Sequence, residues 1–290
     1  MITALDIKLS YEKEFDNLYE SIELEASNCI KIMESVAILE SNNILIEAEA
    51  TEKTLLDKVK VILNKAMMFF KKIKQIAMEK IINLGFKKTK ELTEKCKKEF
   101  ANVTDDLDEY IGKANLEYCF ISDESIDKMN KFIRDDAKGC DELNDAYDSN
   151  DPDKIKEAIA KSHTYNTVNN MNMAASGWIK TVTEKIKDTG KNSIARYCLV
   201  INDRIEDAKK AISDNINQID SIQTLLTRKL KLNNSHEQIE CSLQMVRRFN
   251  DILQLFNKYV MANAKCAYIN YKNLLSIYTQ YKNALSEVKR

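Results

Sequence analysis

The sequence predicts an all-α protein, an elongated bundle of long helices that ends in a coiled-coil-like antiparallel hairpin. The first observation is the scarcity of turn-forming residues: the 290 residues include one proline and five glycines, against average usages of roughly 5% and 7%. The second is that apolar residues recur at steps of three and four over most of the chain, which is the helical period. The third is that the sequence lacks the alternating β-branched runs that a sheet protein of this size would need. With 44% hydrophobic residues, the chain can build a core from a few long elements.

The first expected helix begins near Ser10 and runs to about residue 39, and the segment 41–43 breaks or bends it. Its apolar positions step by three and four along one face. These positions are Phe15, Leu18, Ile22, Ala26, Cys29, Ile32 or Met33, Val36 and Leu39.

The second expected helix begins near Thr51 or Thr54 and runs to about residue 100, roughly 75 Å at 1.5 Å per residue, with Gly85 as a candidate kink. Between residues 55 and 84 it carries a broad apolar face, with lysines outside that face. Three interpretations stay open: a central helix of the protein's own bundle, an interface with other copies or a partner, or a helix on a membrane surface. The interface candidates, which include two C-terminal tyrosines, are Val59, Leu63, Met67, Phe69, Phe70, Ile73, Tyr271 and Tyr278.

The middle of the chain predicts shorter helices. Ser122 can cap one of them, and Asp151 followed by Pro152 is a capping residue with proline at the first helical position. The expected helices cover 105–118, 123–147 and 152–162. Residues 163–178, with four asparagines, fit no class of element.

From Ser193 the chain predicts two long helices joined by a short turn. In the first, apolar positions alternate steps of four and three, a heptad seam with Asn215 at a core position. The seam consists of Ile201, Ile205, Ala208, Ile212, Asn215, Ile219, Ile222 and Leu226. Ser235 and Gln238 form a capping-box pattern, and the same spacing then continues to about residue 285. Two such helices with a short connection predict an antiparallel hairpin.

Charge is segregated into blocks that the net charge of −1 conceals. Residues 1–50 carry a net −8, residues 51–98 +9, residues 99–157 −11 and residues 158–290 +9. Blocks of opposite sign attract when their helices lie side by side. The blocks can therefore pair within one chain, pair between copies, or bind an anionic lipid surface or nucleic acid.

The same features divide the chain into three segments. They are an N-terminal long-helix pair, an acidic middle of short helices and a C-terminal helical hairpin, with boundaries at 1–101, 102–190 and 191–290. The basic residues near the C-terminal tyrosines are too sparse for a phosphate-binding stripe, which disfavours nucleic acid as a partner.

Residue types that carry chemistry are few and scattered. Phosphate-binding glycine loops, zinc-protease motifs and nucleophile-elbow motifs are absent from the sequence, and it has two histidines. The carboxylate pairs Asp105–Asp106 and Asp135–Asp136 fall on faces expected to be solvated. The seven cysteines stand singly, which predicts reduced, mostly buried thiols in a cytosolic protein. We therefore expect no catalytic, cofactor or metal site, and no enzyme activity.

Targeting patterns are also lacking in the sequence. The first 16 residues have no basic segment followed by an apolar run, the pattern of a secretory signal. The longest uncharged run, residues 164–179, is polar and too short to cross a bilayer. We expect a soluble protein made in the cytoplasm.

Residues 34–74 read ESVAILESNNILIEAEATEKTLLDKVKVILNKAMMFFKKIK, an acidic helix followed by a long basic amphipathic helix. In this respect the chain resembles the Lys/Glu/Asn-rich helical virion proteins of tailed phages that infect low-GC Gram-positive bacteria. The resemblance implies a non-enzymatic, multi-copy component of a head, core or tail, which binds itself or other structural proteins and passes from the cytoplasm into the virion. It carries over no functional residue.

Two alternatives stay open. The chain also resembles the α-helical pore-forming toxins in its long helices and its apolar amphipathic segment, which implies a membrane-active protein. Against this, the sequence has no secretion signal and no uncharged hairpin. The other alternative is a cytosolic coiled-coil adaptor.

Overall fold

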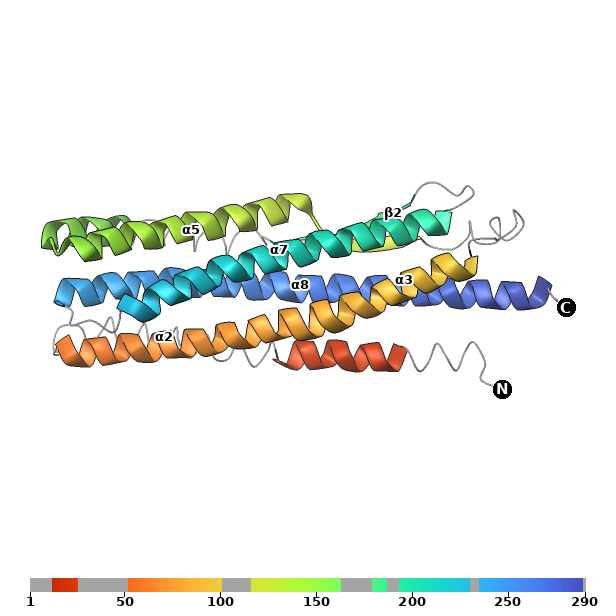
Figure 1. Ribbon diagram of the computed structural model, residues 1–290, viewed down its shortest axis with the longest axis horizontal. Helices are drawn as coiled ribbons and strands as arrows, with labels where there is room; N and C mark the ends of the chain where they lie inside the picture. The colour runs from red at the N-terminus through yellow and green to blue at the C-terminus, as the bar shows by residue number, and fades with distance from the viewer. Residues whose placement is uncertain are drawn as a thin grey trace.

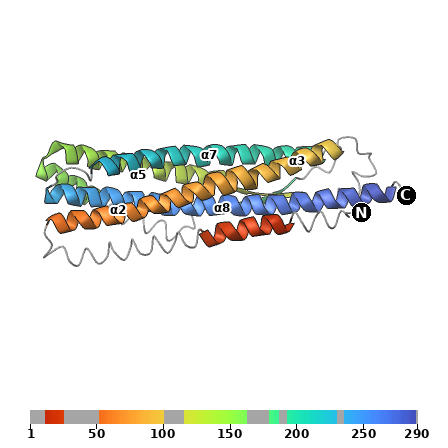
Figure 2. The same ribbon diagram turned by 60° about the horizontal axis from the view of Figure 1, so that its bottom comes forward.

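The computed structural model describes residues 12–25, 52–100, 116–162, 179–186, 193–229 and 235–288 as an elongated helical bundle (Figures 1 and 2). The helices are α2 (Glu52–Gln75), the π-helix η1 (Ile76–Phe86), α3 (Lys87–Phe100), α5 (Asp123–Ser149), α7 (Ser193–Lys229) and α8 (His236–Val288). Two more helices cover 12–25 and 152–162. The strands are β1 (Glu117–Ile121) and β2 (Thr181–Lys185). The predicted all-α class is confirmed, because long helices packed side by side make up nearly all of the fold.

Helix α8 is the spine of the bundle, and the other long helices lie along it (Figure 1). It has 53 residues, or about 80 Å at 1.5 Å per residue. Residues 241–246 and 248–250 are buried on every side of the helix, because α2, α5 and α7 all pack against it. The expected α7–α8 pairing is present, but α8 has more partners than a two-helix hairpin would give it.

The long second helix is present as α2, η1 and α3 in one continuous line (Figure 2). At the expected kink the backbone widens into the π-helix η1, which ends next to Gly85. A Cβ on Gly85 would lie 3.9 Å from both Ala267 and Phe15, an ordinary van der Waals distance, so α8 and helix 12–25 pack against this position without requiring a glycine there. Of the first expected helix, residues 12–25 are helical, and its remainder lies outside the described residues.

The expected helix over 105–118 is wrong at its C-terminal end, where Glu117 and Tyr118 begin strand β1. Strand β1 pairs antiparallel with β2, with Cys119 opposite Thr183. The sequence EYCFI is rich in aromatic and β-branched residues, which suit a strand, and side chains of the helices bind its backbone, as described below. Residues 105–115 lie outside the described part of the chain.

Helix starts follow the predicted caps. The Ser122 hydroxyl accepts the Ser125 N–H at 3.3 Å, and Asp151 Oδ1 accepts the Asp153 N–H at 3.1 Å. Ser235 and Gln238 exchange both bonds of a capping box, at 3.1 and 3.3 Å. These bonds satisfy backbone donors that the first turn of a helix leaves unpaired.

One hydrophobic core runs through the bundle and takes side chains from all three predicted segments. Phe15 stacks on Tyr271 with ring centroids 4.1 Å apart, which joins the N-terminal helix to α8. The segments 1–101, 102–190 and 191–290 therefore share a core in their described parts.

Candidate functional site

The charge blocks pair within one chain. Lys80 and Lys88 of the basic block bind Glu25 and Glu14 of the acidic N-terminal block. The acidic middle block pairs with the basic C-terminal block in the same way. These pairs are Asp123–Arg204, Asp136–Arg248, Asp148–Lys229 and Glu99–Lys282. These pairs realise one of the open interpretations, pairing within the chain.

The interface candidates lie inside the bundle. Seven are between 0% and 6% exposed, and the eighth, Met67, is partly buried against the same core. The seven are Val59, Leu63, Phe69, Phe70, Ile73, Tyr271 and Tyr278. In the folded chain they contact their own bundle, the first of the three interpretations. Another molecule would reach the seven buried side chains only if the bundle opened.

Strand β1 is held to the bundle by side chains that bind its backbone. Asn270 of α8 forms two bonds with Cys119, accepting its N–H at 2.6 Å and donating to its carbonyl at 2.8 Å. The Glu117 carbonyl accepts from Asn273 at 2.9 Å and from the Tyr197 hydroxyl at 2.6 Å. These side chains replace the partner strand that the free edge of β1 lacks.

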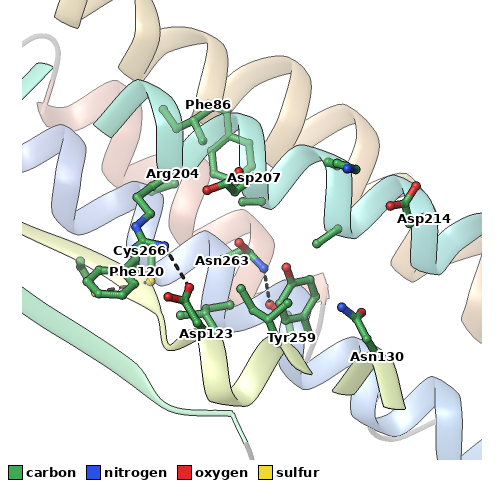
Figure 3. A pocket seen from close by; sticks show the side chains of 18 of the residues that line it. Phe86, Phe120, Asp123, Asn130, Arg204, Asp207, Asp214, Tyr259, Asn263 and Cys266 are labelled. Atoms are coloured by element: carbon green, nitrogen blue, oxygen red, sulfur yellow. Dashed lines mark hydrogen bonds and ion pairs between the residues drawn. The ribbon is translucent and has the colours of Figure 1, made fainter. Parts of the chain in front are cut away.

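A cavity of about 540 Å³ lies where β1 and the start of α5 meet η1, α7 and α8 (Figure 3). Its floor includes the buried Tyr259, Asn263 and Cys266 of α8. Exposed charged side chains, among them Asp207 and Asp214 of α7, line its rim. The cavity is thus polar at its mouth and contains a phenol and thiols at its base.

Electrostatics within the cavity centre on Arg204 and Tyr259. Arg204 binds Asp123 at 3.0 Å, and its guanidinium stacks 4.2 Å from the centroid of the Phe120 ring. The Tyr259 hydroxyl has no hydrogen-bond partner among the described residues. Burial raises the pKa of this phenol to about 12, more than the nearby Asn263 amide lowers it. Tyr259 is therefore a neutral donor at physiological pH.

Six of the seven cysteines lie in the described chain, and all six are buried, as expected. The sequence did not reveal that the fold brings four of these cysteines together as two pairs. The Sγ atoms of Cys119 in β1 and Cys266 in α8 are 3.4 Å apart at the cavity wall. The thiols of Cys96 in α3 and Cys198 in α7 also interact, and this contact and burial raise the pKa of Cys96. Spacing along the chain gave no signal, because the partners are about 100 residues or more apart.

A second polar cluster is buried between α5, α8 and helix 152–162. Arg248 donates to Asp136 Oδ1 at 2.8 Å and to Ser162 Oγ at 3.1 Å. The expectation that Asp135–Asp136 lies on a solvated face is wrong for Asp136, which is 1% exposed because α5 turns this residue toward α8. The pair Asp105–Asp106 lies outside the described residues.

The described residues contain no group of three or more side chains placed to hold a metal ion. Within the same residues, no helix combines the length and apolar character needed to cross a bilayer.

Asn215 occupies the expected core position, with Nδ2 donating to the Ala211 carbonyl at 2.7 Å. The cavity described above offers thiols, a phenol and hydrogen-bonding amides at its base, and charged side chains at its rim.

Comparison of the chain with protein-family models, with curated proteins and with solved structures finds no match.

Proposed function

We propose that this protein is a non-enzymatic structural protein, a helical rod that takes part in a larger assembly. The observation that supports this most is α8, a 53-residue spine with helices packed along its length. Such a bundle holds its ends at a fixed separation of about 80 Å. The resemblance of residues 34–74 to phage virion proteins adds a multi-copy head, core or tail component as the setting.

The pairing of charges restricts how such an assembly would form. Ion pairs between the charge blocks form within the chain, and most apolar side chains of 55–84 are buried in its own core. Contacts with other copies or other structural proteins would therefore use the outer surface. Large apolar side chains exposed there are Leu24, Val61, Met68, Leu84 and Leu199. Apolar contacts of this kind do not weaken as salt rises, whereas exposed ion pairs do.

Light scattering of the reduced protein over a range of salt and protein concentrations tests this proposal. We expect a defined mass that is a multiple of the 33.4 kDa chain and that persists at 1 M salt. A mass that falls to that of one chain as salt rises would show that charge pairs join the copies. A single-chain mass under all conditions would contradict self-assembly and leave a different structural protein as the partner, which co-purification from the native source would identify.

A second candidate, a membrane-active protein, is favoured by one observation. Four of the five residues of β1, Tyr118–Ile121, are apolar or aromatic and buried, and the strand is attached through side chains of α7 and α8 rather than within a large sheet. Such a strand can separate from a bundle without breaking a large sheet. Release of a trapped dye from phosphatidylcholine–phosphatidylglycerol vesicles separates the candidates, because a structural rod releases none.

A further inference from the structure

The thiols of Cys119 and Cys266 are placed to react with each other. They belong to different elements, and 147 residues separate them along the chain. Their Sγ atoms are 3.4 Å apart, and a disulfide requires a separation of roughly 2.05 Å. The two sulfur atoms are therefore in contact, and a modest approach would bring them to bonding distance.

The backbone around Cys119 is held on both sides. On one side, Asn270 binds its N–H and carbonyl groups at 2.6 and 2.8 Å. On the other, Thr183 lies opposite it in β2. This double attachment fixes the direction of the Cys119 thiol toward α8.

The two thiols differ in acidity. Hydrogen bonds from Cys266 and Thr183 and the charge of Lys265 lower the pKa of Cys119, against the effect of burial. The hydrogen bond to Cys119 and burial raise the pKa of Cys266. Cys119 is therefore the thiol that ionises more readily, and the thiolate is the reactive form.

An oxidant can reach the pair through the cavity. Both cysteines line it, and its rim is formed by exposed side chains of α5 and α7. A volume of about 540 Å³ is many times that of a peroxide molecule. Burial at 2% and 6% exposure shields the thiols from larger reagents.

We propose that Cys119 and Cys266 form an oxidisable dithiol, which a hydroperoxide converts to a disulfide that locks β1 onto α8. The Cys119 thiolate attacks a peroxide oxygen, the O–O bond breaks, and Cys119 becomes a sulfenic acid while hydroxide leaves with the electron pair. The sulfur of Cys266 then attacks the Cys119 sulfur, the S–O bond breaks, and a second hydroxide leaves. The two thiol protons join the two hydroxides, so that two thiols and one hydrogen peroxide give one disulfide and two waters.

The reaction links the oxidation state of these two thiols to the compartment in which the protein lies. Thiols stay reduced in a cytosol and become oxidised outside it, virion surfaces included. A protein made in the cytoplasm would thus fold with free thiols and be locked after release. The proposed disulfide depends on the two thiols and the cavity beside them, and does not require the proposed structural role.

Mass mapping of the full chain tests the inference directly. The folded protein is treated with a small excess of hydrogen peroxide, alkylated in denaturant and digested with trypsin without reduction. We expect a linked pair of peptides, 114–128 and 266–272, with a mass two hydrogens below their sum. Recovery of Cys119 and Cys266 as alkylated thiols, as sulfinic acids, or linked to other cysteines overturns the proposal.

Thermal unfolding of the same samples measures how much the disulfide stabilises the fold. Oxidation is expected to raise the melting temperature by about 5–10 °C, because the bond closes a loop of well over 100 residues. Cys119→Ser and Cys266→Ser should lose this rise. The matched control is Cys241→Ser, which removes a buried thiol that donates to the Leu143 carbonyl at 3.2 Å, away from the pair. A rise that survives in Cys119→Ser contradicts the lock, and the wild-type mass map decides the matter if a variant does not fold.

Discussion

Arg248 of α8 donates a hydrogen bond from Nη1 to Oδ1 of Asp136 in α5 at 2.8 Å, with both side chains at most 5% exposed. Its Nε donates to Ser162, so the guanidinium joins three helices. Removing one partner of a buried pair is strongly destabilising, because the other charge stays buried without compensation. This cluster therefore makes the packing of the middle segment on α8 sensitive to single substitutions.

The first prediction concerns pH. Burial raises the pKa of Asp136 to about 7, more than Arg248 lowers it, and the neighbouring Asp135 raises it further. Because the folded-state pKa lies above the unfolded value of 3.8, the stabilisation from protonated Asp136 is complete below pH 3.8 and is lost as pH rises toward 7. Raising the pH from 6 to 8 should therefore lower the free energy of unfolding by about 1 kcal/mol through this group.

Urea unfolding at pH 6 and pH 8 measures the effect. Asp136→Asn should remove this part of the pH dependence and lower stability at pH 8, where the ionised Asp136 is the charged partner of Arg248. Asp135→Asn, at the exposed neighbouring position, is the control and should keep most of the slope. An unchanged slope in Asp136→Asn would assign the pH dependence to other groups.

The second prediction concerns Gly139. A Cβ at this position would lie 2.5 Å from Cζ and Nη1 of Arg248, closer than any real contact. Gly139→Ala should therefore displace the guanidinium and destabilise the protein by about 2 kcal/mol, despite the better helix propensity of alanine. Gly85→Ala is the control, since its closest new contact is 3.4 Å, and it should change the unfolding free energy by less than about 1 kcal/mol. Equal effects at the two glycines would contradict the close contact with Arg248.

The third prediction concerns the attachment of β1. Asn270→Ala removes both bonds to Cys119 and leaves its backbone N–H and carbonyl unpaired on that edge, which should cost about 2–3 kcal/mol. Asn273→Ala removes one bond, to the Glu117 carbonyl, and should cost about 1 kcal/mol. Hydrogen exchange should rise in residues 117–121 of Asn270→Ala ahead of the rest of the fold. Uniformly faster exchange would mean that the strand does not separate by itself.

The fourth prediction distinguishes core from interface on α2. Phe70 is 1% exposed and meets Phe249 of α8 edge to face, with centroids 6.3 Å apart. Phe70→Ala should cost about 3–5 kcal/mol in the single chain, whereas Met68→Ala, at a position 59% exposed, should cost less than about 0.5 kcal/mol. Denaturation at several protein concentrations checks this. A loss in Phe70→Ala that depends on concentration would mean that the side chain also serves an interface between chains.

The sequence by itself determined where most of the described helices lie. Their periodicity and the lack of glycine and proline are local properties, and so are caps such as Ser122 and the Ser235–Gln238 box, because each depends on residues within one or two helical turns. Burial of the seam around Asn215 was predictable for the same reason. Charge blocks indicated which segments attract one another, but left open whether the pairs form within a chain.

Only the tertiary structure decided what lies next to what. Strand β1 pairs with the distant β2, and Asn270, 151 residues away, binds the backbone of Cys119; no local pattern records either contact. The contact of Cys119 with Cys266 and the burial of Asp136 beside Arg248 likewise depend on how distant elements pack onto α8. A helical period places a side chain on a face of its helix, and the partner that covers this face is set by the packing of the whole chain.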